Sequence, residues 1–168
     1  MNRYTVAVLV RNQFGVLNRV TSMFRRRQFN ISALTVSETE STDYSRITVT
    51  FDGEELKKQQ LINQLYKLPD VCSIRELDNE NSVSCELMLI KIENDSQNRE
   101  DIRAAADAFD AKTVDYSRES IVFQLTGDSR RIDDFINLMR DYTILEICRT
   151  GIVSLEKGSS TIRKVTNL

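Results

Sequence analysis

Residues 10–31 read VRNQFGVLNRVTSMFRRRQFNI, and this stretch decides the fold. An apolar strand is expected to end near Val10. After Gly15, apolar residues recur at a spacing of about 3.6, which is typical of one buried helix face. These residues are Val16, Leu17, Val20, Met23 and Phe24. The polar residues 28–30 end the pattern and Ile31 opens another strand, so the stretch predicts strand, short loop, helix and strand.

The short loop of this stretch predicts a small anion site. The first turn of a helix leaves four N–H groups without partners, and the helix dipole adds about half a positive charge there. Gly15 lets the backbone approach a ligand closely because it has no Cβ. Asn12 offers a donor and an acceptor, which suits an amino acid that carries a carboxylate and an ammonium. The alternative interpretation is that Asn12 is only a helix N-cap and Gly15 only a turn residue.

The rest of the chain repeats one order of elements twice. In the first half, the expected strands cover residues 4–10, 31–37, 46–51 and 71–77, and the expected helices cover 16–27 and 54–68. Pro69 is expected to stop the second helix. In the second half, the expected strands cover residues 85–92, 112–116, 121–126 and 144–149, and the expected helices cover 98–110 and 127–139.

This order of elements predicts an α+β protein with two ferredoxin-like βαββαβ domains in tandem. Each domain should place two helices on one face of an antiparallel sheet. The expected boundaries are an N-terminal domain at 1–78, a linker at 79–84, a C-terminal domain at 85–157 and a flexible tail at 158–168. Many unrelated functions use such domains, so the fold alone names none of them.

Composition argues against catalysis by this chain alone. The 168 residues include no histidine, so the commonest general acid or base is missing. The sequence has no nucleophile triad, phosphate-binding loop or dinucleotide fingerprint. Its three cysteines are far apart and lack metal-ligand spacing. We therefore expect no catalytic residues, no metal site and no cofactor on this chain.

The net charge and the hydropathy of the chain limit the classes of partner that it is expected to bind. The net charge of −2 gives no general attraction to nucleic acid or membranes. No apolar run could span a bilayer and no signal-peptide pattern follows Met1, so a cytoplasmic protein is expected. An RNA-binding module is a further hypothesis, because residues 25–27 are arginines between Phe24 and Phe29. These arginines are better explained as a solvated helix C-terminus, where cations are favourable.

Several segments carry a resemblance to a known family. They are residues 10–20 (VRNQFGVLNRV), 29–36 (FNISALTV), 45–48 (SRIT), 64–68 (QLYKL) with Val71, 86–92 (ELMLIKI) and 149–153 (RTGIV). Their order and spacing resemble the small regulatory subunit of acetolactate synthase (acetohydroxyacid synthase), whose N-terminal half is an ACT domain. The resemblance covers nearly the whole chain, so it is far more specific than the fold.

The resemblance implies a non-catalytic subunit of branched-chain amino acid biosynthesis. A separate large subunit would hold thiamine diphosphate, magnesium and FAD and form acetolactate. The small subunit would activate it and confer feedback inhibition by valine, which binds between two ACT domains of a homodimer. The matching effector-binding positions are Asn12, Gly15, Val16, Leu17, Asn30 and Ile31.

One departure from the family pattern concerns the far end of the first helix. The family usually has glycine where this chain has Gln28, so we expect the turn into Asn30 to be altered. A less specific alternative is an ACT-type amino-acid sensor that regulates a different enzyme or a transcription factor. Valine, leucine and isoleucine differ by little more than a methylene, which is worth only about 1–3 kcal/mol, so the sequence does not choose among them.

Overall fold

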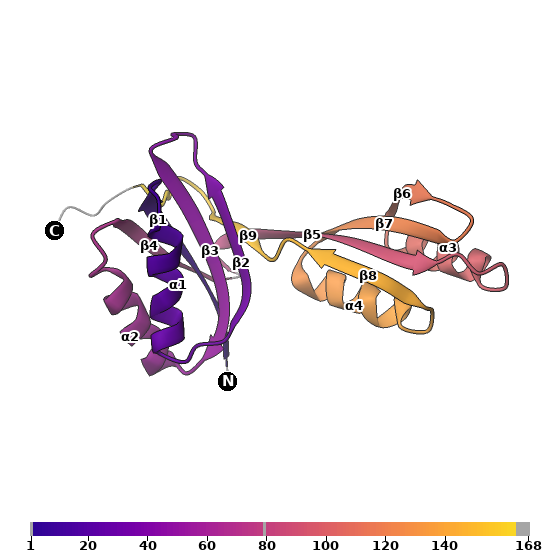
Figure 1. Ribbon diagram of the computed structural model, residues 1–168, viewed down its shortest axis with the longest axis horizontal. Coiled ribbons are helices and arrows are strands. Elements are labelled where there is room, and N and C mark those ends of the chain that lie inside the picture. Colours follow the sequence, from indigo (N-terminus) through magenta and orange to yellow (C-terminus); the bar gives the residue numbers. More distant parts are fainter. Residues whose placement is uncertain (1, 79, 164–168) are drawn as a thin grey trace. The chain divides into compact units, whose positions relative to one another are not determined.

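The computed structural model describes residues 2–78 and 80–163, and the chain forms two compact units (Figure 1). The first unit contains the residues up to Ser84 together with those from Ile152 onward. The second unit is Cys85–Gly151. Each unit combines an antiparallel sheet with a pair of helices. The predicted α+β class with two βαββαβ units is therefore confirmed.

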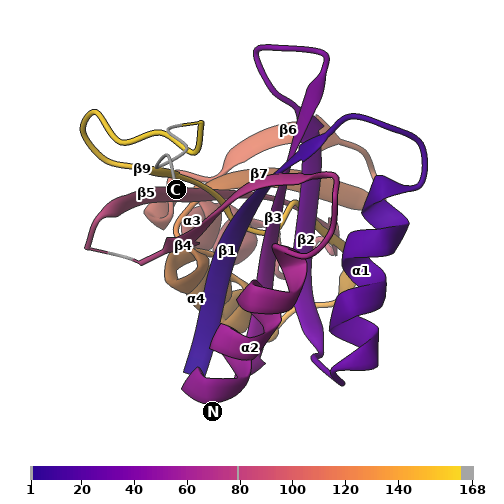
Figure 2. The same ribbon diagram turned by 90° about the vertical axis from the view of Figure 1, so that its left-hand side faces the viewer.

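The first unit places both helices on one face of its sheet (Figure 2). The strand order is β2-β3-β1-β4, with antiparallel neighbours throughout. β2 is therefore an edge strand. The bounds are β1 Asn2–Arg11, α1 Val16–Arg26, β2 Ile31–Glu38, β3 Tyr44–Gly53, α2 Glu55–Leu65 and β4 Val71–Leu77.

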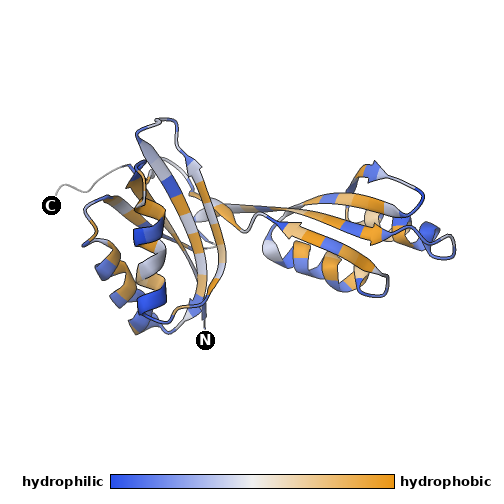
Figure 3. Cartoon of the chain, viewed as in Figure 1, coloured by the Kyte–Doolittle hydropathy of each residue, from blue (hydrophilic) through white to orange (hydrophobic). Residues whose placement is uncertain are grey.

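The core of the first unit follows from alternation along the two central strands. The side chains that pack against the helices are Val6, Val8 and Val10 on β1 and Ile47, Val49 and Phe51 on β3. Phe51 meets Phe24 of α1 at 5.5 Å and Phe29 at 5.1 Å between ring centroids, both nearly edge to face. Figure 3 shows hydrophobic residues interspersed with hydrophilic and neutral ones along the strands of this sheet. The predicted apolar stripe of α1 thus meets the apolar side of the sheet. The central strands are buried on their other side as well, where Ala7, Leu9, Thr48 and Thr50 lie.

The second unit has the strand order β6-β7-β5-β8. The strand β9 belongs to the first unit and pairs with β5 outside this path. The helices of the second unit contribute Ile102, Ala106, Ile132, Phe135 and Met139 to a separate core, which they share with β5 and β7. The bounds are β5 Ser82–Glu93, α3 Arg99–Ala108, β6 Lys112–Tyr116, β7 Ser120–Gly127, α4 Ser129–Met139, β8 Ile144–Arg149 and β9 Val153–Glu156.

The end of the chain differs from the predicted domain boundaries. The predicted C-terminal domain, 85–157, is longer than the observed second unit, because residues from Ile152 onward contact the first unit. In that segment, Ser154 bonds to Ser84 through their hydroxyls at 2.9 Å and accepts a bond from Arg46 Nη2 through its carbonyl at 2.7 Å. Within the predicted flexible tail, residues 158–161 are exposed, and Arg163 pairs with Glu40 at 2.8 Å. Residue 79 of the predicted linker and tail residues 164–168 lie outside the described residues.

The C-terminal end of α1 shows how the chain accommodates Gln28. Gln28 has φ +57°, the left-handed conformation that glycine adopts most easily. The N–H of Phe29 donates to Phe24 O at 3.0 Å and that of Gln28 to Arg25 O at 3.1 Å, which together form a Schellman motif. The rings of Phe24 and Phe29 also meet. Gln28 therefore takes a backbone conformation that glycine adopts readily, and the expectation that glutamine alters the turn into Asn30 stays a prediction.

Gln28→Gly is expected to stabilise the first unit by about 1 kcal/mol. A residue with a Cβ is strained in the left-handed conformation by roughly 1–2 kcal/mol, and the greater freedom of glycine in the unfolded chain offsets part of that gain. The measurement is urea denaturation of the full chain. Gln13→Gly is a suitable control, because Gln13 does not have a positive φ and therefore carries no such strain. This substitution should not raise the urea midpoint. An unchanged or lower midpoint for Gln28→Gly would contradict the strain argument.

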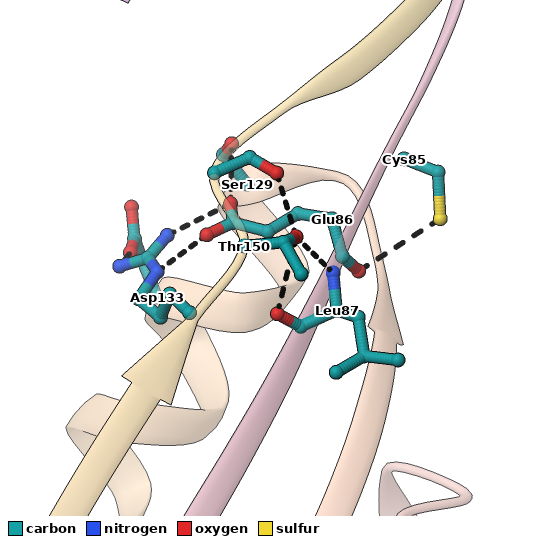
Figure 4. Close-up of polar contacts among 8 residues, drawn as sticks. Cys85, Glu86, Leu87, Ser129, Asp133 and Thr150 are labelled. Carbon is teal, nitrogen blue, oxygen red and sulfur yellow. Dashed lines mark hydrogen bonds and ion pairs between the residues drawn. The ribbon is translucent and has the colours of Figure 1, made fainter. Parts of the chain in front are cut away.

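A buried ionic network joins β5, β8 and α4 of the second unit (Figure 4). Glu86 is only 2% exposed and accepts from Arg149 Nε at 2.6 Å and Nη2 at 3.0 Å. The Ser129 hydroxyl donates to the same carboxylate at 3.0 Å, and Arg149 also pairs with Asp133 at 2.8 Å. Burial alone would raise the pKa of Glu86, but the Arg149 and Ser129 bonds outweigh it and lower that pKa. The network therefore holds a fully partnered buried charge.

Within the described ranges, no helix has the length and apolarity needed to cross a membrane.

Candidate functional site

The Asn12 side chain does not bond to the backbone N–H groups at the start of α1, as the side chain of a helix cap would. Asn12 Nδ2 donates to Glu38 Oε1 at 3.0 Å and to the carbonyl of Thr42 at 2.9 Å. Its backbone N–H donates to Asp43 O at 2.8 Å. The N-cap of α1 is Gly15, and no side chain caps the helix. The alternative that Asn12 is an N-cap is therefore wrong, and the loop is held by the β2–β3 turn.

The start of α1 has the features of an anion site. Gly15 has φ +80°, so any residue with a Cβ would be strained there. The first turn contains no acidic residue. Val16 N–H bonds to Gln13 O at 3.2 Å, but the described residues offer no acceptor to the N–H groups of Leu17 and Asn18. Two helix-start donors are thus available to a carboxylate beside an exposed loop.

The two apolar positions at the helix start have different environments. The Val16 side chain is 3% exposed and belongs to the core, so it does not form a ligand wall within this chain. Leu17 is exposed, as is Phe14 in the loop before it. Leu17 can therefore supply apolar contact to a ligand, whereas Val16 positions the helix.

Asn30 and Ile31 lie at the other end of α1. The helix has 11 residues, which corresponds to a length of about 16 Å at 1.5 Å per residue. Asn30 is exposed, and Ile31 packs partly against the core while pairing with Phe51 across the strands. One chain therefore does not bring all six predicted effector residues together. It presents Asn12, Gly15 and Leu17 at one end of the helix and the other pair at the opposite end.

The edge strand β2 connects these two ends and carries exposed apolar side chains. Leu34 pairs with Val49 and Val36 with Ile47, so both side chains lie on the face of the sheet that carries the helices. Leu34 and Val36 nevertheless remain exposed. An edge strand of this kind presents unpaired backbone groups and an apolar border, which favour pairing with another strand.

The site can bind a small molecule but offers little acid–base chemistry. The polar groups predicted to contact a ligand are two asparagine amides and backbone N–H groups, which do not titrate near neutral pH. The lysine whose pKa is shifted, Lys58, lies elsewhere, on α2. Burial of its ammonium lowers the pKa, but the bonds to Glu55 and Glu76 outweigh burial and raise the pKa of Lys58. Among residues 2–78 and 80–163, no group of three cysteine or acidic residues could hold a metal.

Sequence reasoning missed Glu38 and Thr42 as partners of Asn12. The segment from Glu38 to Asp43 has the composition of a polar turn, and no local signal connects it to a loop 26 residues earlier. Only the pairing of β1 and β2 with β3 brings the two loops to the same end of the sheet.

Comparison with known proteins agrees with this architecture. The family described as the small subunit of acetolactate synthase matches residues 85–158, and the ACT domain of AHAS small-subunit type matches residues 6–73. A probable acetolactate synthase small subunit of Archaeoglobus fulgidus is 43% identical, over 94% of this chain and 98% of that protein. The Bacillus subtilis small subunit is 40% identical, over 92% and 90% of the two chains.

A solved structure gives the same result for the fold. The acetolactate synthase small subunit of Thermotoga maritima matches with a TM-score of 0.86 and 34% identity, over 95% of this chain and 100% of that one. The ACT-type βαββαβ unit places this chain in the class of ACT-domain proteins. Within that class, this chain belongs to the acetolactate synthase small-subunit family.

Proposed function

We propose that this chain is the non-catalytic regulatory subunit of acetolactate synthase in branched-chain amino acid biosynthesis. It activates the thiamine-diphosphate-dependent large subunit and mediates feedback inhibition by valine. The uncapped α1 start beside Asn12 carries the proposal, because it offers donors for a carboxylate in a family of acetolactate synthase small subunits. Thiamine diphosphate, magnesium and FAD belong to the large subunit in this proposal.

The proposed effector is a small zwitterion with a branched apolar side chain. Its carboxylate takes the N–H groups of Leu17 and Asn18, and its ammonium takes the Asn12 amide oxygen. Leu17 and Ile31 supply the apolar wall. Val16 contributes through its position in the helix, because its side chain is buried.

A homodimer explains why one chain separates the predicted effector residues. Two β2 edges that pair antiparallel about a two-fold axis place the Glu38 end of one strand against the Ile31 end of the other. The start of α1 in one subunit then lies near the end of α1 in its partner. Asn12 and Gly15 thereby meet Asn30 of the partner subunit, and two effector sites form at the interface.

Val36→Lys is expected to convert this dimer largely to monomer at micromolar concentration. The two-fold axis brings two new charges into one apolar interface, and like charges there cost several kcal/mol, so the dissociation constant should rise about hundredfold or more. Light scattering after gel filtration measures the mass. Leu56→Lys is the matched control, because Leu56 is an exposed apolar residue of α2. A monomeric wild type, with or without valine, would contradict the dimer.

Reconstitution tests the proposed function directly. The purified chain alone should form no acetolactate, whereas its addition to the large subunit should raise the rate, because binding favours the competent state of that partner. Valine should then inhibit the complex. Activity of this chain without the large subunit would overturn the assignment. Binding to a different enzyme, with no effect on acetolactate formation, would support the ACT-type sensor instead.

A further inference from the structure

The contacts of Asn12 determine how its amide is turned. Both partners of Nδ2, the Glu38 carboxylate and the Thr42 carbonyl, only accept hydrogen bonds. The nitrogen must therefore face them, and both of its hydrogens are used. Among the described residues, no donor contacts Asn12 Oδ1. The oxygen is thus the atom that remains for a ligand, and it can accept a bond but cannot donate one.

The turn that holds Asn12 is itself braced. Thr39 N–H donates to Tyr44 O at 3.0 Å, and the Thr39 hydroxyl donates to Ser41 O at 3.0 Å. From the C-terminal segment, Arg163 pairs with Glu40 and lies over the Tyr44 ring at 5.5 Å. These contacts fix the ends of the turn, so Glu38 and the Thr42 carbonyl form a prearranged platform for the Asn12 amide.

We propose that Glu38 is a positioning and specificity-determining residue of the effector site, which holds the Asn12 amide so that Oδ1 receives the ammonium of an α-amino acid. This inference rests on the proposed function of the site. Glu38 has a second role, because its carboxylate lies one amide group away from the bound ammonium and favours a cation there. The site therefore prefers an amino acid over the corresponding hydroxy acid.

Two substitutions separate the roles of Glu38. Glu38→Gln keeps an acceptor for Asn12 but removes the charge, whereas Glu38→Ala removes both. Calorimetry on the full chain uses two probes, L-valine and 2-hydroxy-3-methylbutanoate, which carries a hydroxyl in place of the ammonium. Glu38→Gln should weaken valine binding about three- to tenfold, as expected for one nearby charge in a solvated site, and should change hydroxy-acid binding by less than about twofold. Glu38→Ala should weaken both probes.

The matched control is Glu54→Gln, which removes the same charge from an exposed residue before α2 that has no contact with the turn holding Asn12. It should bind valine like the wild type. Equal weakening of both probes by Glu38→Gln would show a merely structural role and overturn the proposal, as would unchanged valine binding in both Glu38 variants. A wild type that binds neither probe would instead overturn the proposed function itself.

A second readout needs no effector. In the wild type, the side-chain NH2 resonances of Asn12 should be resolved and protected from solvent exchange, because both hydrogens are bonded. Glu38→Ala should increase their exchange rate, while Glu54→Gln should leave it unchanged. Equal exchange in Glu38→Ala and the wild type would remove the positioning argument even where valine binding had weakened.

Discussion

Arg149→Met should destabilise the second unit by about 3–5 kcal/mol, because it leaves a buried carboxylate without its cation. Glu86 keeps only the Ser129 hydroxyl and the Gly151 N–H as donors in that variant. The Arg149 side chain is 34% exposed, which favours the lower end of the range, whereas that of Glu86 is 3% exposed. Denaturation of the full chain, with hydrogen exchange to assign the loss to β8 and α4, measures the effect.

The comparison variants isolate the buried charge. Arg118→Met makes the same substitution in an exposed turn and should change stability by no more than about 0.5 kcal/mol. Glu86→Leu combined with Arg149→Met removes both charges and should recover much of the loss, since a buried ion pair is often replaceable by apolar residues. A loss of less than about 1 kcal/mol in Arg149→Met alone would show that water reaches Glu86.

The same network predicts acid sensitivity. The pKa of Glu86 is lower in the folded state than the unfolded value of about 4.3, so its contribution to stability is fully present above that value. The contribution is lost as the pH falls through the folded pKa. The protection factors of amide hydrogens in the second unit of the wild type, which are corrected for the intrinsic pH dependence of exchange, should therefore decrease below about pH 4, and the double variant should show a weaker dependence.

The overall fold could be predicted because its elements are locally encoded. The apolar stripe from Val16 to Phe24 matches the observed burial of Val16, Val20 and Phe24. On β3 the predicted apolar positions are buried, but Thr48 and Thr50 between them are buried as well, which the alternation did not predict. The strand β9 was missed, since its four residues alternate apolar and polar over too short a segment to indicate a strand. It forms by pairing with the start of β5, about 70 residues earlier, where Lys157 N–H donates to Asn81 O at 2.7 Å. Pairing across such distances leaves no local signal.

The candidate site was predictable only in part for a similar reason. Gly15 and the free donors after it follow from the loop sequence and from general helix geometry. The burial of Val16 depends on which side of the helix meets the sheet, and the contact between Asn12 and Glu38 depends on the topology of three strands. Exposed apolar residues of β2 indicate an interface, but a sequence pattern does not say which face stays uncovered.

Removal of the Asn12 side chain is the substitution with the largest expected effect on regulation. In Asn12→Ala, the bound amino acid loses a hydrogen bond between its ammonium and Oδ1. A hydrogen bond to a charged group contributes roughly 1.5–3 kcal/mol, so valine affinity should fall about ten- to over a hundredfold. The stability cost should be small, because Glu38 and Thr42 are exposed and their acceptors can turn to water.

Activation and inhibition should separate in this variant. Activation of the large subunit needs the docking of two proteins, for which a loop amide is not required, whereas inhibition depends on occupancy of the site and is lost with binding. We therefore expect an active complex that resists valine. Asn63→Ala, on the exposed face of α2, should keep the wild-type response. Valine titrations of the three reconstituted complexes decide the matter: superimposable inhibition curves for the wild type and Asn12→Ala would exclude Asn12 as an effector ligand.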